Sequence, residues 1–316
     1  MKMTGKIVLT GATGFLGSHT LPILQKKYGK ENVIGLSSQD YDLTKPDQVR
    51  KMFEERDPET LVHFAAYVGG IGANAKLPAD FFYINTLLTS LAFEYAAKKK
   101  IKKMIYPIGG CCYPHTAPSP ISEDQMWNGY PQAEGAGYAM AKKVGVVASM
   151  SYREQYGLNS IIIVPGNMYG EYDNYSINDS HVIPATIRKM FEAKQENKPI
   201  VSMWGSGIAQ RDFVYAGDVA ATIPFFIEKY NSTDAINISS GTTTSIKELA
   251  ETVKELVGYE GKIQWDLSKP DGQLVKIFDT RRMKELGIQC PTSLKEGLKK
   301  TVDWFSANYD SGKVRL

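Results

Sequence analysis

The sequence is poor in cysteine and histidine, and it has no long apolar run. Its 316 residues include three cysteines and four histidines. Three cysteines, of which Cys111 and Cys112 are adjacent, cannot form a disulfide framework, so we expect a reducing compartment. No window of about 18 uncharged apolar residues and no apolar signal region is present. We therefore predict a cytoplasmic protein without a membrane partner, and we assign no metal ligands.

The chain also lacks a strong charge of one sign. The formal net charge is +3, and basic residues are scattered through the sequence. The one basic run, at 96–103, is typical of a solvated helix end. Nucleic-acid binding needs a dense Lys/Arg stripe, so we expect no nucleic-acid partner.

Short apolar runs alternate with helix-length segments up to about residue 170. The runs KIVLTG, TLVHFAA and NSIIIVPGN are typical of buried strands, and ADFFYINTLLTSLAFEYAAKKK is of helix length. This alternation predicts an α/β fold of the Rossmann type, a doubly wound parallel sheet covered on both faces. We expect one domain over 1–170, a smaller C-terminal lobe over 171–316, and a return of the chain to the first domain near 211–240.

A glycine-rich loop follows the first expected strand. KIVLTGATGFLG places Gly11, Gly14 and Gly17 between that strand and a helix. Glycines at this spacing allow a tight turn and a close approach of a pyrophosphate to the helix N-terminus. The segment 1–170 is therefore predicted to bind a dinucleotide.

The end of the second expected strand bears on which dinucleotide is bound. A carboxylate there would bind a ribose 2′-hydroxyl and repel a 2′-phosphate. VIGLSSQD has Ser37 and Ser38, and no carboxylate, at the expected strand end, which favours NADP(H) over NAD(H). No arginine is present there to hold the phosphate, so NAD(H) stays open.

A tyrosine and a lysine lie one helical turn apart in AGYAMAKKVG. Tyr138 and Lys142, spaced i and i+4, are expected on one helix face. A nearby ammonium favours the phenolate and lowers the tyrosine pKa, so that the phenol can pass a proton to a carbonyl oxygen near neutral pH. Ketone reduction by hydride requires such an acid.

These motifs give the sequence a family resemblance. VGGIGAN, CCYP, YAMAKK, PGNMYG, SHVIPA and KPDG resemble the extended short-chain dehydrogenase/reductases, and within them the GDP-L-fucose synthase branch. The resemblance implies NADP(H) in the N-terminal lobe, a GDP-sugar in the C-terminal lobe and a homodimer packed through two helices per subunit. It also implies NADPH-dependent reduction of the C-4 ketone of a GDP-4-keto-sugar, a 6-deoxyhexose or a heptose, with or without 3,5-epimerisation.

The resemblance assigns roles by position. Tyr138 would protonate the C-4 oxygen with Lys142 supporting it, and Cys111 and His181 would move protons at C-3 and C-5. The cofactor-binding candidates are Gly11, Thr13, Gly14, Phe15, Leu16, Gly17, Ser37, Ser38, Asp42, Ala65, Ala66, Lys142, Pro165, Asn167, Met168 and His181. The substrate-binding candidates are Gly109, Cys111, Tyr138, Asn167, Arg188, Lys189, Trp204, Arg211 and Asp271.

The segment PIGGCCYP departs from the family pattern. Alignment on Tyr113 and Pro114 puts Cys111 on the family cysteine and Gly109 where the family has a serine that hydrogen-bonds the substrate carbonyl. Loss of such a donor costs about 2.7–4 kcal/mol in other enzymes. If the segment is extended, Cys111 and Cys112 point to opposite sides. Retention of epimerisation therefore stays open.

Three other functions compete with reduction. A nucleotide-sugar 4,6-dehydratase needs an acidic residue next to the catalytic hydroxyl, and GGCCYP has none. A 4-epimerase that retains NAD would leave Cys111 and His181 without a role. A non-catalytic dinucleotide sensor would need neither Tyr138 nor Lys142, so their presence favours an enzyme.

Overall fold

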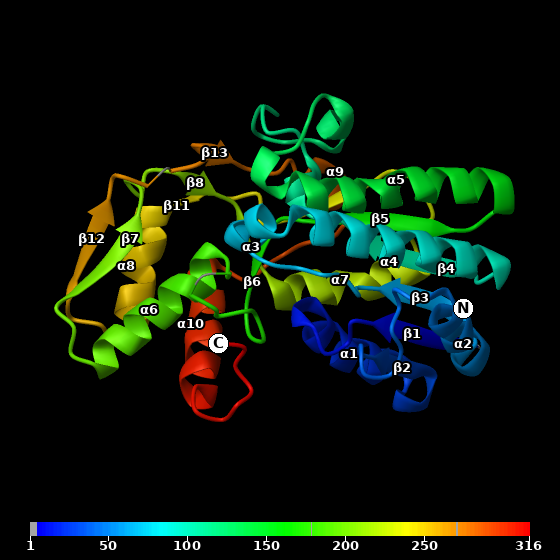
Figure 1. Cartoon of the computed structure of the whole chain (residues 1–316), viewed down its shortest axis with the longest axis horizontal. Helices are drawn as coiled ribbons and strands as arrows, with labels where there is room; N and C mark the ends of the chain where they lie inside the picture. The colour runs from blue at the N-terminus through cyan, green and yellow to red at the C-terminus, as the bar shows by residue number, and fades with distance from the viewer. Residues whose placement is uncertain (1–4, 178, 270) are drawn as a thin grey trace.

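A six-stranded parallel sheet forms the centre of the larger lobe (Figure 1). The fold is taken from a computed structural model, which describes residues 5–177, 179–269 and 271–316. Every neighbouring pair of strands in this sheet is parallel. In sheet order the strands are β10 (Ile236–Ile238), β5 (Ser160–Pro165), β4 (Lys103–Pro107), β3 (Pro58–His63), β1 (Lys6–Thr10) and β2 (Val33–Leu36).

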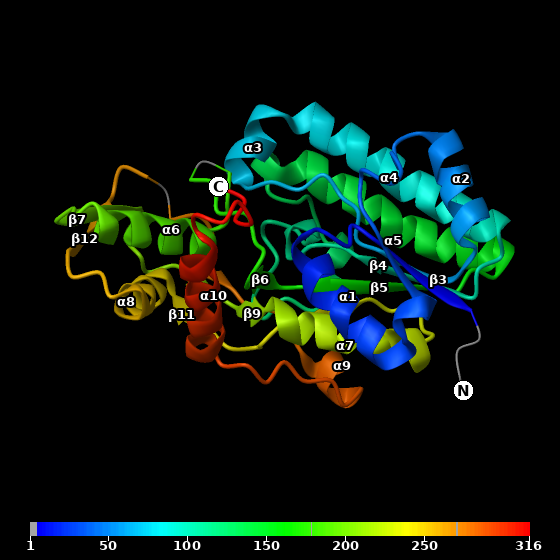
Figure 2. The same cartoon turned by 90° about the horizontal axis from the view of Figure 1, so that it is seen from below.

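Helices cover both faces of this sheet, because successive strand residues point to opposite sides (Figure 2). Ile7 and Leu9 of β1 pack with one set of helices, whereas Val8 packs with the other. The first set is α1 (Phe15–Tyr28) and α7 (Ala216–Glu228). The second set is α2 (Pro46–Arg56), α4 (Pro78–Lys98) and α5 (Ala136–Tyr156). The predicted fold class, a doubly wound parallel sheet with a smaller lobe, is confirmed.

The smaller lobe has a core of its own. Its parallel pair β7 (Ile200–Trp204) and β12 (Lys262–Asp266) packs with three helices around residues such as Ile187 and Leu249, which are fully buried. The helices are α6 (Val182–Gln195), α8 (Ile246–Val257) and α10 (Leu294–Asn308). A three-stranded sheet contains β11 (Thr244–Ser245), β8 (Gln210–Arg211) and β13 (Val275–Lys276).

The chain passes between the lobes more than once. The pair β6 (Asn167–Tyr169) and β9 (Phe213–Tyr215) lies between them, after which α7 packs on α1 and β10 pairs with β5. The helix α9 (Arg281–Glu285) also packs against β10, a second return that the sequence analysis did not predict. The remaining short elements are η1 (Lys30–Asn32), α3 (Ile71–Lys76), η2 (Gly110–Cys112), η3 (Glu123–Trp127) and η4 (Ala133–Gly135).

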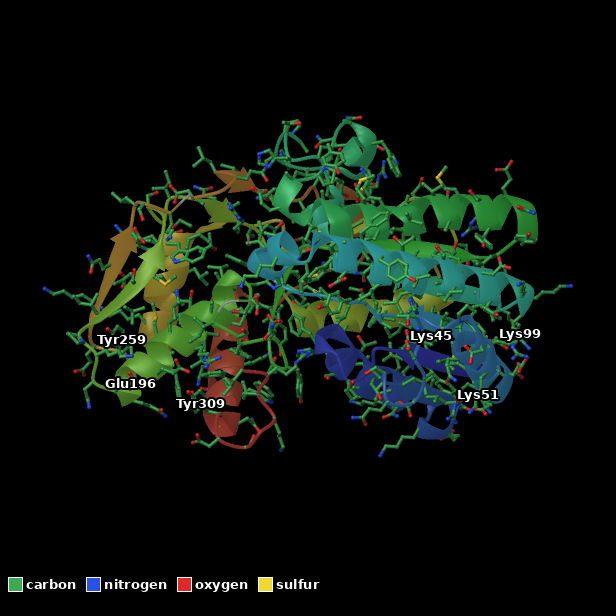
Figure 3. All side chains as sticks on the ribbon, viewed as in Figure 1. Lys45, Lys51, Lys99, Glu196, Tyr259 and Tyr309 are labelled. Atoms are coloured by element: carbon green, nitrogen blue, oxygen red, sulfur yellow. The ribbon has the colours of Figure 1, made fainter. Side chains whose placement is uncertain are left out.

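Side chains fill the space between these layers, and charged residues such as Lys51 and Lys99 point outward (Figure 3). Among the described helices, none combines the length and the apolar character needed to cross a bilayer.

Candidate active site

The predicted cofactor residues of the larger lobe follow the carboxyl ends of the strands of the sheet. In a parallel sheet all strands end on the same side, so the loops after β1, β3, β4 and β5 meet there. The order of the strands reverses between β1 and β3, which is where such sheets bind ligands. Thr10 and His63 end these two strands and share a 2.9 Å hydrogen bond between Oγ1 and Nδ1. Burial lowers the pKa of His63 to about 3, so this histidine is neutral.

The glycine loop has the geometry that a pyrophosphate needs. Gly11 has a φ of 68°, a conformation that favours glycine. A Cβ on Gly17 would lie 2.1 Å from the Gly11 carbonyl oxygen, so this position brings α1 against the loop. A Cβ on Gly14 would approach only that same oxygen, at 3.1 Å, and its other side is open. The open side of Gly14, with no acidic residue in the first turn of α1, fits a dinucleotide phosphate.

A turn brings a carboxylate back to the end of β2, where the sequence predicted none. Asp40 folds back, and its Oδ2 accepts hydrogen bonds from the Ser37 backbone nitrogen at 2.7 Å and from Ser37 Oγ at 2.8 Å. The carboxylate of Asp42 is held by Thr44, through its backbone nitrogen and hydroxyl. The expectation of a strand end without a carboxylate was therefore wrong, because a turn returns Asp40 to Ser37.

Tyr138 and Lys142 both lie on α5, as predicted. The pKa of Tyr138, however, is shifted in the opposite direction to the one expected from a nearby ammonium. Burial raises the pKa of Tyr138 well above its ordinary value, and the nearby Cys111 thiol adds to this shift. The Lys142 ammonium lies 3.9 Å from the centroid of the Tyr106 ring, and burial lowers its pKa to about 8. In this structure Tyr138 is therefore a protonated phenol, the form that can donate a proton.

The Gly-Gly-Cys-Cys segment is a turn and is not extended. Residues Gly110–Cys112 form η2, and the Cys112 backbone nitrogen donates to the Gly109 carbonyl at 2.9 Å. Cys112 is fully buried with its Sγ 3.4 Å from the Ala139 carbonyl, whereas Cys111 is exposed. The two thiols are hydrogen-bonded to each other. The expectation that they point to opposite sides does not apply, because it assumed a strand.

Gly109 has no side chain, and the space where its Cβ would lie is bordered by the Cys111 sulfur and the Tyr138 ring. A Cβ on Gly109 would lie 3.1 Å from Cys111 Sγ and 3.9 Å from Tyr138 Cε1. The hydrogen bond from Cys112 lowers the pKa of the Cys111 thiol to about 7, and the charge of Lys276 adds to this effect. The site therefore combines a protonated phenol with a thiol that is partly ionised at neutral pH.

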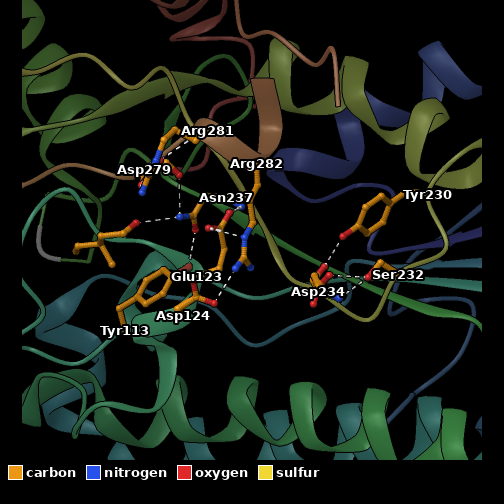
Figure 4. A network of polar contacts seen from close by, with 11 residues as sticks. Tyr113, Glu123, Asp124, Tyr230, Ser232, Asp234, Asn237, Asp279, Arg281 and Arg282 are labelled. Atoms are coloured by element: carbon orange, nitrogen blue, oxygen red, sulfur yellow. Dashed lines mark hydrogen bonds and ion pairs between the residues drawn. The ribbon is translucent and has the colours of Figure 1, made fainter. Parts of the chain in front are cut away.

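A buried polar network holds the cysteine turn in place (Figure 4). Tyr113, directly after the cysteines, donates from its hydroxyl to Asn237 Oδ1 at 2.6 Å. Asn237 Nδ2 donates to the carbonyls of Ile121 and Asp279, and its backbone nitrogen donates to Glu123 at 2.9 Å. The strand β10 thus fixes the segment that follows Cys111 and Cys112.

His181 belongs to the smaller lobe, where it directly precedes α6 and is exposed. The carbonyl of Asp179, two residues earlier, accepts a 2.7 Å hydrogen bond from the Gly70 backbone nitrogen in the VGGIGAN motif. Asp173 is buried near His181, and burial raises the pKa of this carboxyl to about 6, opposed by the His181 charge. Arg315 holds the same segment, because its carbonyl accepts from the Tyr175 nitrogen at 2.7 Å.

The cationic side chains that were predicted to contact the substrate already bind groups of the protein itself. Arg188 Nε lies 2.6 Å from Glu192 Oε1. Lys189 Nζ is 3.5 Å from the Ser202 carbonyl, and burial lowers its pKa. Arg211 Nη1 donates to the Gln273 carbonyl at 2.5 Å.

The remaining substrate candidates differ in availability. The Asp271 carboxylate accepts from the Ser206 backbone nitrogen and hydroxyl at 2.7 and 2.8 Å. Asn167 Nδ2 donates to the Asp212 carbonyl at 2.9 Å. Trp204 is 63% exposed, which leaves its ring free to contact a ligand.

Lys276 is a site residue that the sequence analysis missed. It lies on β13 in register with Arg211, and its charge helps to lower the pKa of the Cys111 thiol. A two-residue strand has no periodicity, so only its position four residues after the end of the KPDG motif indicated it. Among the described residues, no cluster of three or more His, Cys, Asp or Glu side chains could hold a metal ion.

Comparison with known families explains this combination of a glycine loop, Tyr138 and Lys142. Residues 7–239 match the sequence profile described as "NAD dependent epimerase/dehydratase family". The chain belongs to this family. The match covers the glycine loop, the cysteine turn and the Tyr138–Lys142 pair, and it ends directly after β10.

This epimerase/dehydratase family member is similar to GDP-L-fucose synthases along nearly its whole length. It is 38% identical to "Probable GDP-L-fucose synthase 1" of Oryza sativa subsp. japonica, covering 98% of this chain and 94% of that protein. It is 33% identical to "GDP-L-fucose synthase" of Escherichia coli (strain K12), covering 96% and 98%. The predicted resemblance to this branch is confirmed.

Two solved structures of the family are also similar. The "gdp-l-fucose synthetase from Naegleria fowleri" has a TM-score of 0.93 and 27% identity, covering 100% of this chain and 98% of that chain. "MlghC, GDP-mannoheptose C4 reductase from Campylobacter jejuni with NADP bound" has a TM-score of 0.88 and 28% identity, covering 97% and 99%.

Proposed function

We propose that this protein reduces the C-4 ketone of a GDP-4-keto-sugar with NADPH. The observation that carries the proposal is the position of Tyr138 beside Gly109 and Cys111. These residues follow the carboxyl end of β4, on the same side of the sheet as the glycine loop after β1. Relatives named as GDP-L-fucose synthases and as a GDP-mannoheptose C4 reductase support a GDP-sugar substrate, a 6-deoxyhexose or a heptose.

The protein's residues have separate tasks in this reaction. NADPH, when bound at the glycine loop, supplies the hydride. Tyr138 is protonated at neutral pH and donates its proton to the C-4 oxygen as negative charge develops there. Lys142 is positively charged at neutral pH, because its pKa is about 8, and it stabilises the phenolate left after the proton is donated.

Reduction coupled to 3,5-epimerisation is the second candidate function. The lowered pKa of Cys111 favours it, since a carbon acid next to a ketone needs a base that is ionised at neutral pH. Cys111 from the larger lobe and His181 from the smaller lobe are the proposed pair for this proton exchange. The remaining substrate contacts are proposed for Lys189, Arg211 and Trp204.

One experiment separates the two functions. The purified protein is incubated in D₂O with NADPH and a panel of GDP-4-keto-sugars, and both the cofactor absorbance and the deuterium content of the product are measured. Loss of absorbance without deuterium at C-3 or C-5 identifies a C-4 reductase. Deuterium at these carbons that Cys111→Ser suppresses, with reduction of an already epimerised sugar retained, identifies the coupled reaction. No NADPH oxidation with any sugar contradicts the proposal.

NADP(H) is the proposed cofactor. A similar structure with NADP bound supports it. The Asp40 carboxylate opposes it, because it would repel a 2′-phosphate placed beside Ser37.

We also propose a homodimer packed through α4 and α5. Tyr83 on α4 and Val147 and Met150 on α5 are between 51% and 65% exposed, although they are apolar or aromatic. Met150→Glu should convert the dimer to a monomer in analytical ultracentrifugation. Ile200→Glu, at a similarly exposed position on β7, is the control that should leave the dimer intact.

A further inference from the structure

Two thiols of unequal character lie in the turn beside Tyr138. Cys111 is exposed, whereas the adjacent Cys112 is fully buried. Both residues lie in the η2 turn, and their side chains interact, since a hydrogen bond between the thiols shifts the pKa of each. The third cysteine, Cys290, lies between β10 and α10 in the sequence and is only partly exposed.

The environment prepares Cys111 to act as the nucleophile and Cys112 as its partner. The hydrogen bond from Cys112 lowers the pKa of Cys111 to about 7, and burial raises the pKa of Cys112. The charge of the Cys111 thiolate adds to the shift of Cys112. Once Cys111 carries a neutral group in place of the thiolate, this part of the shift disappears, so Cys112 becomes easier to ionise.

We propose that Cys111 and Cys112 form a reversible disulfide when the protein meets hydrogen peroxide, and that this disulfide switches off the chemistry of Cys111. The Cys111 thiolate attacks one peroxide oxygen, the O–O bond breaks, and hydroxide leaves. Cys112 then attacks the resulting sulfenic sulfur, the S–O bond breaks, and water leaves with the Cys112 proton. The two thiols lose two electrons, and the peroxide gains them as it becomes two waters.

The geometry of adjacent residues makes such a bond easy to reverse. Consecutive Cα atoms are about 3.8 Å apart across a trans peptide, below the usual Cα separation of about 4.4–6.8 Å in disulfides. A disulfide forced into this spacing is strained, and strained disulfides have more oxidising potentials than structural ones. Cellular thiols would therefore reduce it, as expected of a regulatory bond.

The functional consequence rests on the proposed function, since Cys111 is one of its proposed proton-transfer residues. Oxidation would join the Cys111 sulfur to a buried atom and remove its ionisable proton from the cleft. It would leave the glycine loop unchanged, so nucleotide binding should persist in the oxidised protein.

The test measures mass and free thiols, so it does not depend on activity. The full chain is treated with a small excess of hydrogen peroxide near pH 7.5. One part is analysed directly by mass spectrometry, and the other is unfolded in denaturant that contains N-ethylmaleimide, so that every free thiol is labelled and counted. We expect a loss of about two mass units and a fall in free thiols from the three of the untreated chain to one, at Cys290, with both changes reversed by dithiothreitol.

Two variants give the matched comparison. Cys112→Ala should instead accumulate sulfinic acid on Cys111, which dithiothreitol does not reverse. Cys290→Ala should give the same disulfide as the wild type. Sulfinic acid on Cys111 of the wild type with Cys112 still free, or a disulfide that includes Cys290, overturns the proposal. A reversible disulfide in a protein that reduces no GDP-4-keto-sugar would leave the inferred disulfide standing, and would reject the proposed function together with the functional consequence that rests on it.

Discussion

The lowered pKa of Cys111 predicts a measurable rate of alkylation. At pH 7 a thiol with a pKa of about 7 is half ionised, compared with about 1% for a thiol at the ordinary value of 9.0. The thiolate population is thus about 50-fold larger. A thiolate of lower pKa is also a weaker nucleophile, by about six- to tenfold over two pKa units. We therefore expect Cys111 to react with iodoacetamide about five- to eightfold faster than an ordinary exposed thiol at pH 7.

The assay follows alkylation of each cysteine by mass spectrometry between pH 5.5 and 9.5. Cys290 is an internal control, because burial raises its pKa to about 12 and it should stay unreacted in the folded protein. The rate at Cys111 should rise through an inflection near pH 7. Cys112→Ala should move the inflection upward, because it removes the hydrogen bond that contributes most to the shift.

Lys276→Met should also move the inflection upward, by a smaller amount, because it removes a positive charge that favours the thiolate. Lys269→Met is the matched control, a lysine of the same lobe that lies near Trp204. An inflection at pH 8.5 or above in the wild type would refute the reasoning. So would an unchanged inflection in folded Cys112→Ala, because the hydrogen bond would then not be the main cause.

Three further predictions concern the cofactor and the acid. Gly14→Val should abolish NADPH binding in calorimetry with little loss of thermal stability, whereas Gly17→Val should destabilise the fold, because its Cβ would lie 2.1 Å from a carbonyl oxygen. Tyr138→Phe should lower turnover by about 10²-fold or more with NADPH affinity nearly unchanged, and wild-type turnover would exclude it as the acid. NADPH should bind more tightly than NADH, and tighter NADH binding by the wild type would reverse the cofactor assignment. Asp40→Asn should strengthen NADPH binding by about 1 kcal/mol, or fivefold, because it removes a charge that repels the 2′-phosphate.

Local patterns carried the predictions that the structure confirms. The first strand, its glycines and the alternation of apolar runs with helices are properties of short segments, so they predict a doubly wound parallel sheet without knowledge of distant contacts. Assignment to a family of dinucleotide-dependent enzymes followed from motifs of the same length.

The differences arose where a side chain meets a neighbour that the sequence does not reveal. A tight turn returns Asp40 to Ser37, although the strand ends four residues before Asp40. Burial, rather than the ammonium one turn away, sets the pKa of Tyr138. Arg188 is paired with Glu192 on its own helix, which spacing alone does not distinguish from a ligand contact.

The attachment of Arg315 to the segment before His181 has a consequence for the order of folding. The guanidinium of Arg315 donates to the Tyr172 carbonyl, a contact between residues 143 positions apart, and a β-bridge joins Arg315 to Asn174. Contacts of high sequence separation close large loops and form late, whereas neighbouring strands of the sheet are joined by shorter connections. The segment that leads to His181 should thus fold after the sheet. It should also be the first part to open in mild denaturant, so that proton exchange at the sugar ring fails while the dinucleotide loop is still folded.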